Sequence, residues 1–86
     1  VALNHAVAVA MRDGPEAGLL LVENIFASGQ LGEYYLAYAT RADLCRRAGR
    51  LEDAISNYQL ALERTQLEPE RRFLQRRISE LQTSAS

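Results

Sequence analysis

The chain has 86 residues and a formal net charge of −1, and 48% of its residues are hydrophobic. A chain of this length folds as one small domain that buries about 60–65% of its unfolded surface. The apolar content excludes a disordered chain, and the near-neutral charge excludes a whole-chain field that would hold nucleic acid. The single cysteine cannot form an internal disulfide, so we expect a cytoplasmic protein.

Two helices are predicted in the first part of the chain, from about Ala2 to Arg12 and from Pro15 to about Phe26. Gly14 supplies a C-terminal stop for the first helix, and Pro15 suits the first turn of the second. The Asp13-Gly14-Pro15 connection has one carboxylate and one glycine, too few for a calcium or phosphate loop. It is therefore predicted to be a plain turn between helices.

The first helix is apolar almost all round. It lacks a preceding basic segment, and it is shorter than the ~20 residues that span a bilayer, so we expect neither a signal peptide nor a membrane partner. Its outer side needs a cover, either upstream helices of a longer polypeptide or a second copy in a homodimer. On its inner side, close approach to the second helix is predicted at Ala6, Ala10 and Gly18.

The third and fourth predicted helices, about Glu33–Ala48 and about Leu51–Thr65, carry the most informative spacing. Large and small residues alternate at helical intervals on both, and a glycine separates the two sets: Tyr38, Ala42, Cys45, then Gly49, then Ala54, Tyr58, Ala61. Small residues let two antiparallel helices approach closely while the tyrosines fill the space beside them. This is the spacing of one tetratricopeptide unit.

The rest of the chain fits the same architecture. Gly14 and Gly49 lie 35 residues apart, close to the ~34-residue tetratricopeptide period, so the first two helices are interpreted as a second copy. A fifth helix, from about Glu68 to Leu81, has the one-sided amphipathicity of a capping helix. The predicted fold is all-α: about five antiparallel helices, as two hairpins plus a cap in a right-handed superhelix over residues 1–82, with a flexible tail at 83–86.

No catalytic arrangement is predicted. His5 and Cys45 are the only residues of their types, so they cannot build a zinc site, and we expect no metal, cofactor or enzymatic activity. A Cys-His dyad is formally possible. Cys45 occupies a core position of the hairpin, however, and a buried thiol is usually inert.

An arginine-rich segment at 70–77 is the best candidate for nucleic-acid contact, through Arg71, Arg72, Arg76 and Arg77. Acidic residues accompany these arginines, so a solvated, ion-paired face is the favoured interpretation and phosphate contact the alternative.

Candidate interaction residues lie mainly on the third helix. Arg41 stands where a tetratricopeptide unit ordinarily has an aliphatic residue, so it needs a carboxylate from Asp13, Glu16 or an upstream segment, or else extends to solvent. Of Tyr34 and Tyr35, one is expected to offer an aromatic surface. The inner side of the hairpin is expected to carry a charged set that reads a charged peptide: Asp43, Arg46 and Arg47.

A family resemblance covers almost the whole chain. It rests on Leu3–Met11 followed by Asp13-Gly14-Pro15, on Arg41–Leu44 with Arg46–Arg50, and on several later positions: Ala54, Tyr58, Ala61-Leu62, Glu70–Leu74 and Arg76-Arg77. With these residues the chain resembles the tetratricopeptide-like C-terminal domain of a group of bacterial extracytoplasmic-function RNA polymerase sigma factors. That group is commonly paired genetically with small partner proteins of the YCII-related type.

The resemblance implies a regulatory protein-interaction domain that supports transcription initiation. Its expected partners are the sigma core, RNA polymerase and a small partner protein, and DNA would be contacted only by upstream domains. Asn4, Tyr34, Arg41 and Asp43 match the family pattern and are the residues implied to dock. The alternative is a free-standing tetratricopeptide adaptor that binds peptides or self-associates, with no role in transcription.

Overall fold

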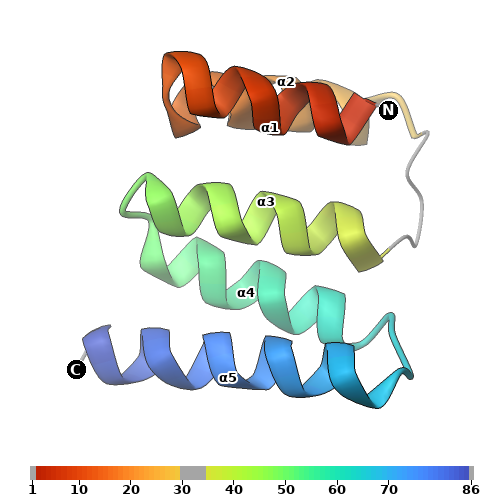
Figure 1. The fold of residues 1–86 in the computed structure, drawn as a ribbon, viewed down its shortest axis with the longest axis vertical. Coiled ribbons are helices and arrows are strands. Elements are labelled where there is room, and N and C mark those ends of the chain that lie inside the picture. Colours follow the sequence, from red (N-terminus) through yellow and green to blue (C-terminus); the bar gives the residue numbers. More distant parts are fainter. Residues whose placement is uncertain (1, 30–34, 86) are drawn as a thin grey trace.

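The computed structural model describes residues 2–29 and 35–85, and over these residues the chain forms five helices and no strand. They are α1 (Ala2–Asp13), α2 (Pro15–Ala27), α3 (Tyr35–Arg47), α4 (Leu51–Leu62) and α5 (Glu68–Ala85). Successive helices run antiparallel: α1 and α2 form one hairpin, α3 and α4 a second, and α5 packs along α4 (Figure 1). The all-α prediction is confirmed, and the right-handed superhelix stays a prediction.

The α1–α2 hairpin forms around a close contact between small residues. Ala6 is fully buried, and Ala10 is 6% exposed. A Cβ added to Gly18 would lie 2.6 Å from the Ala10 Cβ and 2.9 Å from the Ala6 carbonyl oxygen. Gly14 ends α1 with a φ of +101°, which L-residues rarely adopt, and Pro15 opens α2. The predicted turn and the predicted close approach are both confirmed.

The α3–α4 hairpin shows the predicted alternation of small and large side chains. Ala42, Ala54 and Ala61 are fully buried, and Tyr58 is the largest of the fully buried side chains, at 1% exposed. Gly49 closes α3 with a φ of +81°, which lets the Arg50 backbone N–H donate to the Cys45 carbonyl at 2.8 Å. The spacing read from the sequence therefore corresponds to a real helical interface.

Two helix ends differ from the prediction. Helix α4 ends at Leu62 rather than near Thr65. The Arg71 guanidinium caps this end by donating to the Leu62 and Thr65 carbonyls at 2.8 and 2.9 Å. Helix α5 continues to Ala85, through residues 83–85 that were expected to form a tail. No glycine or proline stands there to stop it.

Helix α5 presents two different faces. Leu74 and Leu81 are buried against the α4 side, with Ile78 partly buried beside them. Phe73 is instead 46% exposed, so Leu74 and not its neighbour Phe73 fills the first core position of this helix. Within the described residues, no helix combines the length and apolarity needed to cross a bilayer.

Replacing Gly18 with alanine should destabilise the domain by roughly 1–3 kcal/mol, because the new methyl group meets the α1 backbone and forces the hairpin apart. In an open helical position the same change would stabilise by about 0.5–1 kcal/mol. Urea unfolding followed by circular dichroism measures the difference. The matched control is Asn24→Ala, at an exposed position of the same helix, which should leave stability unchanged or slightly raised. An equally stable Gly18→Ala protein would contradict the close contact.

Candidate protein-interaction site

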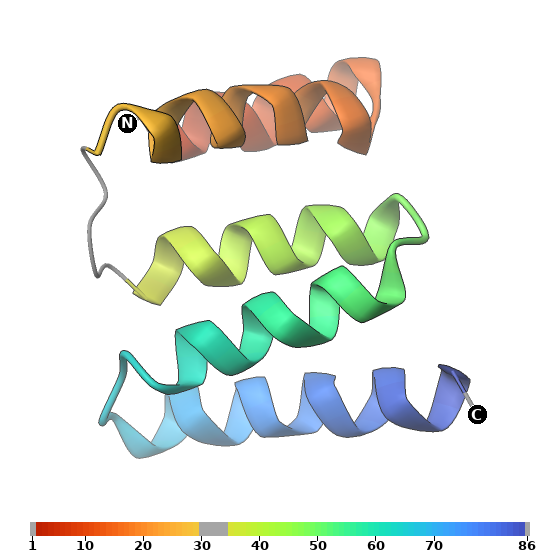
Figure 2. The same ribbon diagram turned by 180° about the vertical axis from the view of Figure 1, so that it is seen from behind.

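An apolar groove lies between α1, α3 and α5, and we define it by Val7, Leu36, Ala39, Thr40 and Phe73. It consists of two adjoining hollows of about 190 and 250 Å³. Leu36, Ala39 and Phe73 line both hollows, and Val7 and Thr40 line the smaller one. Helix α1 belongs to the first hairpin, α3 to the second and α5 to neither (Figure 2). Only the assembled domain therefore forms this groove.

Two large apolar side chains at the centre of the groove remain accessible to solvent. Leu36 is 40% exposed and Phe73 46% exposed. Adjoining exposed apolar side chains in a concave surface are typical of a site that another molecule covers. Neither residue was among the interaction positions predicted from the sequence. The available signal was the sequence Phe73-Leu74, in which only one neighbour can face the core.

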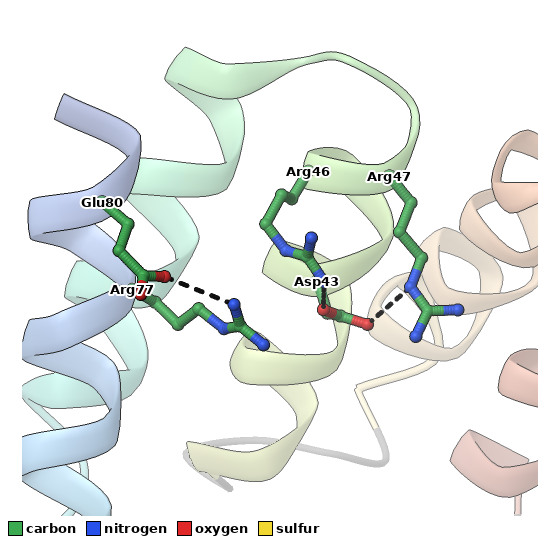
Figure 3. A network of polar contacts seen from close by, with 5 residues as sticks. All are labelled: Asp43, Arg46, Arg47, Arg77 and Glu80. Atoms are coloured by element: carbon green, nitrogen blue, oxygen red, sulfur yellow. Dashed lines mark hydrogen bonds and ion pairs between the residues drawn. The ribbon is translucent and has the colours of Figure 1, made fainter. Parts of the chain in front are cut away.

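One end of the apolar groove is charged. The Arg46 guanidinium donates to Asp43 Oδ1 at 2.5 Å, and Arg47 Nε lies 3.1 Å from Asp43 Oδ2. From α5, Arg77 pairs with Glu80 at 3.3 Å, and its side chain extends toward α3 (Figure 3). The structure thus places Asp43, Arg46 and Arg47 in contact with one another and Arg77 close to them, and their role in reading a charged peptide stays a prediction. We call these four side chains, together with Glu80, the charged end.

Three buried polar atoms meet at this end without a hydrogen-bond partner among the residues that the structure describes. They are Arg46 Nε, Arg77 Nε and the Tyr58 hydroxyl. Burial raises the pKa of Tyr58, and hydrogen bonding from Arg46 lowers it by a smaller amount, so the hydroxyl lies beside the Arg46 guanidinium. The two groups lie close enough for a hydrogen bond to affect both pKa values, but the angles and distances fall short of a well-formed bond. Hydrogen bonding by Asp43 raises the pKa of Arg46, which keeps the guanidinium charged.

At the opposite end of the groove, the Glu70 carboxylate accepts hydrogen bonds from two other parts of the chain. The Tyr35 hydroxyl donates to Glu70 Oε2 at 2.5 Å, and the Thr65 hydroxyl donates to Glu70 Oε1 at 2.6 Å. These bonds join α3, the α4–α5 connection and α5. They favour the charged carboxylate, so Thr65 and then Tyr35 lower the pKa of Glu70. Tyr35 is therefore partly buried in a structural contact, whereas Tyr34 lies outside the described residues.

Arg41 lies away from the groove, at a polar pocket of about 300 Å³ between α2, α3 and α4. Its Nε donates to Asn57 Oδ1 at 2.7 Å, and its terminal nitrogen donates to Glu23 at 3.1 Å. The guanidinium also stacks on the Phe26 ring, 3.9 Å from the centroid. The carboxylate partner is thus Glu23, and not Asp13 or Glu16 as the sequence suggested.

The contacts of Arg41 tie three helices together. Asn57, only 9% exposed, also donates from Nδ2 to the Asp53 carbonyl at 2.8 Å, so Arg41 supplies the bond for its oxygen. These interactions account for the position of Arg41 inside the domain. Its role in docking stays a prediction.

Cys45 lines the same polar pocket but is 5% exposed. Burial raises the pKa of its thiol, with Asp53 adding to the effect, so the thiolate that nucleophilic chemistry needs is disfavoured. His5 is exposed on α1. In the part of the chain that the structure describes, no group of three or more histidine, cysteine, aspartate or glutamate side chains is placed to hold a metal.

The remaining predicted positions lie on the surface. Asn4 is exposed on α1, on the helix that also exposes Met11 at 74%. On α5, Arg71 caps α4 and Arg77 belongs to the charged end, which leaves Arg72 and Arg76 exposed on the outer side. The arginine segment is thus divided between structural contacts and solvent.

Comparisons with known proteins give one informative similarity. No protein-family profile matches the chain, and no solved structure matches it. The chain is 37% identical over 62 residues to an uncharacterized protein of Rhizobium meliloti (strain 1021). The aligned segment covers 72% of this chain and 14% of the length of that protein.

Truncating Arg41 to alanine should destabilise the domain by about 1–3 kcal/mol, because it leaves the Asn57 oxygen unpaired in a nearly buried position. Urea unfolding measures the loss. Arg72→Ala, which removes an exposed arginine from α5, should change stability by less than about 0.5 kcal/mol. Equal stabilities for the two variants would show that the Arg41 contacts contribute nothing.

The Glu70 contacts predict a specific pH dependence. Because the pKa of Glu70 is lowered from its ordinary value of 4.5, its carboxylate stabilises the folded state above that pH and loses this effect as the pH falls through the lowered value. The wild-type protein should therefore lose more thermal stability between about pH 5 and pH 3 than the Glu70→Gln variant. Melting curves over this range test the difference, with Glu63→Gln as an exposed control that should follow the wild type.

Proposed function

We propose that this chain is a protein-interaction domain of a bacterial extracytoplasmic-function sigma factor and supports transcription initiation in the cytoplasm. The observation that carries the proposal is the apolar groove with its charged end, which offers exposed Leu36 and Phe73 next to an ordered set of arginines and carboxylates. Aromatic and arginine side chains around a hollow are the usual composition of an interaction hot spot.

The sigma-factor part of the proposal is supported by the family resemblance. The residues that carry it include Asp13-Gly14-Pro15, which forms a turn, and Asp43, Arg46 and Arg47, which lie together at the charged end. The similar segment in Rhizobium meliloti makes up 14% of a longer protein, which supports a unit of this kind working beside other domains.

The proposed mechanism is binding without chemistry. The groove would hold a segment of the sigma core, of the polymerase or of a small partner protein. When such a segment belongs to the same polypeptide, tethering raises its effective concentration to about the millimolar range, so a weak contact is enough to fix the arrangement of domains. DNA would be contacted by other parts of the full-length protein.

A free-standing adaptor that self-associates is the second candidate. It is favoured by the exposed apolar residues of the first hairpin, Met11 at 74% and Leu20 at 70%. Contacts between copies through α1 would cover Met11. Sedimentation of the 86-residue chain tests self-association, which predicts a dimer that Met11→Glu disrupts; a chain that stays monomeric would exclude it.

The groove can be tested by replacing Leu36 and Phe73 with serine in the full-length coding sequence. The double variant should lower transcription from a responsive promoter, or affinity for the bound partner, by about tenfold or more, because it removes both exposed apolar contacts. Circular dichroism checks that the domain stays folded.

The matched control is the double variant Arg72→Ser and Arg76→Ser, on the exposed outer side of α5. It should leave transcription unchanged. Normal transcription and affinity in the folded groove variant would exclude this surface as the site of interaction. A loss confined to the α5 control would instead point to phosphate contact by the arginine segment.

A further inference from the structure

We propose that the charged end of the apolar groove is a carboxylate-binding site formed by Tyr58, Arg46 and Arg77, and that it recognises an apolar–acidic segment of a protein partner. The inference rests on the proposed function and specifies what the groove binds.

The first step concerns unpaired donors. Arg46 Nε, Arg77 Nε and the Tyr58 hydroxyl come from α3, α5 and α4, and each is buried without a hydrogen-bond partner among the described residues. Unpaired buried donors are rare and costly in native proteins. A site at which three helices each contribute such a donor is suited to an acceptor that a binding partner supplies.

The second step concerns the chemistry of that acceptor. A carboxylate only accepts hydrogen bonds, and its two oxygens can take bonds from two guanidinium groups and a hydroxyl at once. The nearby Asp43 carboxylate pairs with Arg46 and Arg47, and among the described residues it accepts no hydrogen bond from Arg77 Nε or from the Tyr58 hydroxyl. A hydroxyl or an amide would satisfy the donors less well than an anion does.

The third step is the balance of charge. The charged end holds three arginines and two carboxylates, an excess of one positive charge (Figure 3). A carboxylate carries one negative charge and neutralises that excess. A phosphate group carries about −1.5 to −2 at neutral pH and would leave uncompensated negative charge beside Asp43.

The fourth step links the carboxylate to an apolar side chain. Tyr58 and Asp43 line the same hollow of about 190 Å³ as Leu36 and Phe73. This volume is below the roughly 300–1,000 Å³ of sites for small molecules, and it suits individual side chains of a bound segment. One segment can therefore place an apolar side chain on Phe73 and a carboxylate at Tyr58.

Binding of the segment would disrupt only a weak ion pair, that of Arg77 with Glu80. Arg77 is held by Glu80 at 3.3 Å in an exposed pair three residues apart on the same helix, and pairs of that kind contribute little. The Arg77 guanidinium also lies 5.3 Å from the centroid of the Phe73 ring, so it already stands beside the apolar part of the site.

The test selects ligands from a random 12-residue peptide library displayed on phage, using the folded 86-residue chain. Selected peptides should carry Asp or Glu within about four residues of a large apolar residue. Synthetic copies in which that acid is replaced by Asn or Gln should bind the wild type about tenfold more weakly, since a charge-assisted hydrogen bond is lost.

Arg77→Gln and Tyr58→Phe should each reduce the difference between the acidic and amide peptides, because each removes one donor and leaves the apolar groove intact. Tyr58→Phe keeps the buried ring, and circular dichroism checks both folds. Arg76→Gln, at an exposed position on the same helix, is the matched control and should keep the full tenfold preference.

Each other result overturns the proposal. Peptides that depend on Phe73 but bind equally well as acids and amides would leave the groove as an interaction site and remove the carboxylate site. An acid preference that survives both Arg77→Gln and Tyr58→Phe would place it elsewhere. If no selected peptide loses affinity in the Leu36→Ser and Phe73→Ser variant, the proposed groove fails as well.

Discussion

Tyr58 connects the core of this protein to its candidate binding surface. Its ring is the largest fully buried side chain and belongs to the same apolar cluster as Ala42, Leu44 and Leu74. Helices α3 and α4 approach closely because small residues surround this ring, and α5 packs against the pair. The hydroxyl at the end of the same side chain reaches the charged end, so the packing that stabilises the fold also fixes the position of one unpaired donor.

Several arginines in this domain stack on a ring or donate to more than one partner, which lysine would do less well. All ten basic residues are arginine. Arg41 stacks on Phe26 while bonding two other helices, and Arg71 donates to two carbonyls at the end of α4. A planar group with several donors can satisfy such distributed partners at once. Three further arginines, Arg46, Arg47 and Arg77, lie together at the charged end of the groove.

The two polar regions of the domain are of different kinds. Around Arg41 the donors and acceptors are hydrogen-bonded to one another, so that region is best explained as a structural contact between α2, α3 and α4. At the charged end, the carboxylates are paired while three donors are not. An incomplete set next to exposed Leu36 and Phe73 is the stronger indication of binding, although Arg41 is the more unusual residue in the sequence.

The sequence by itself determined the helices, their turns and the small residues at their interfaces, because glycine conformation and helical spacing act over short distances along the chain. Gly14, Gly49 and the close approach at Gly18 could all be read in this way. The identity of the Arg41 partner, the choice of Leu74 over Phe73 for the core and the meeting of Tyr58 with Arg46 and Arg77 were decided only by the tertiary structure. Each of these depends on how α2, α4 and α5 are rotated and placed against α3, and spacing within one helix does not contain that information.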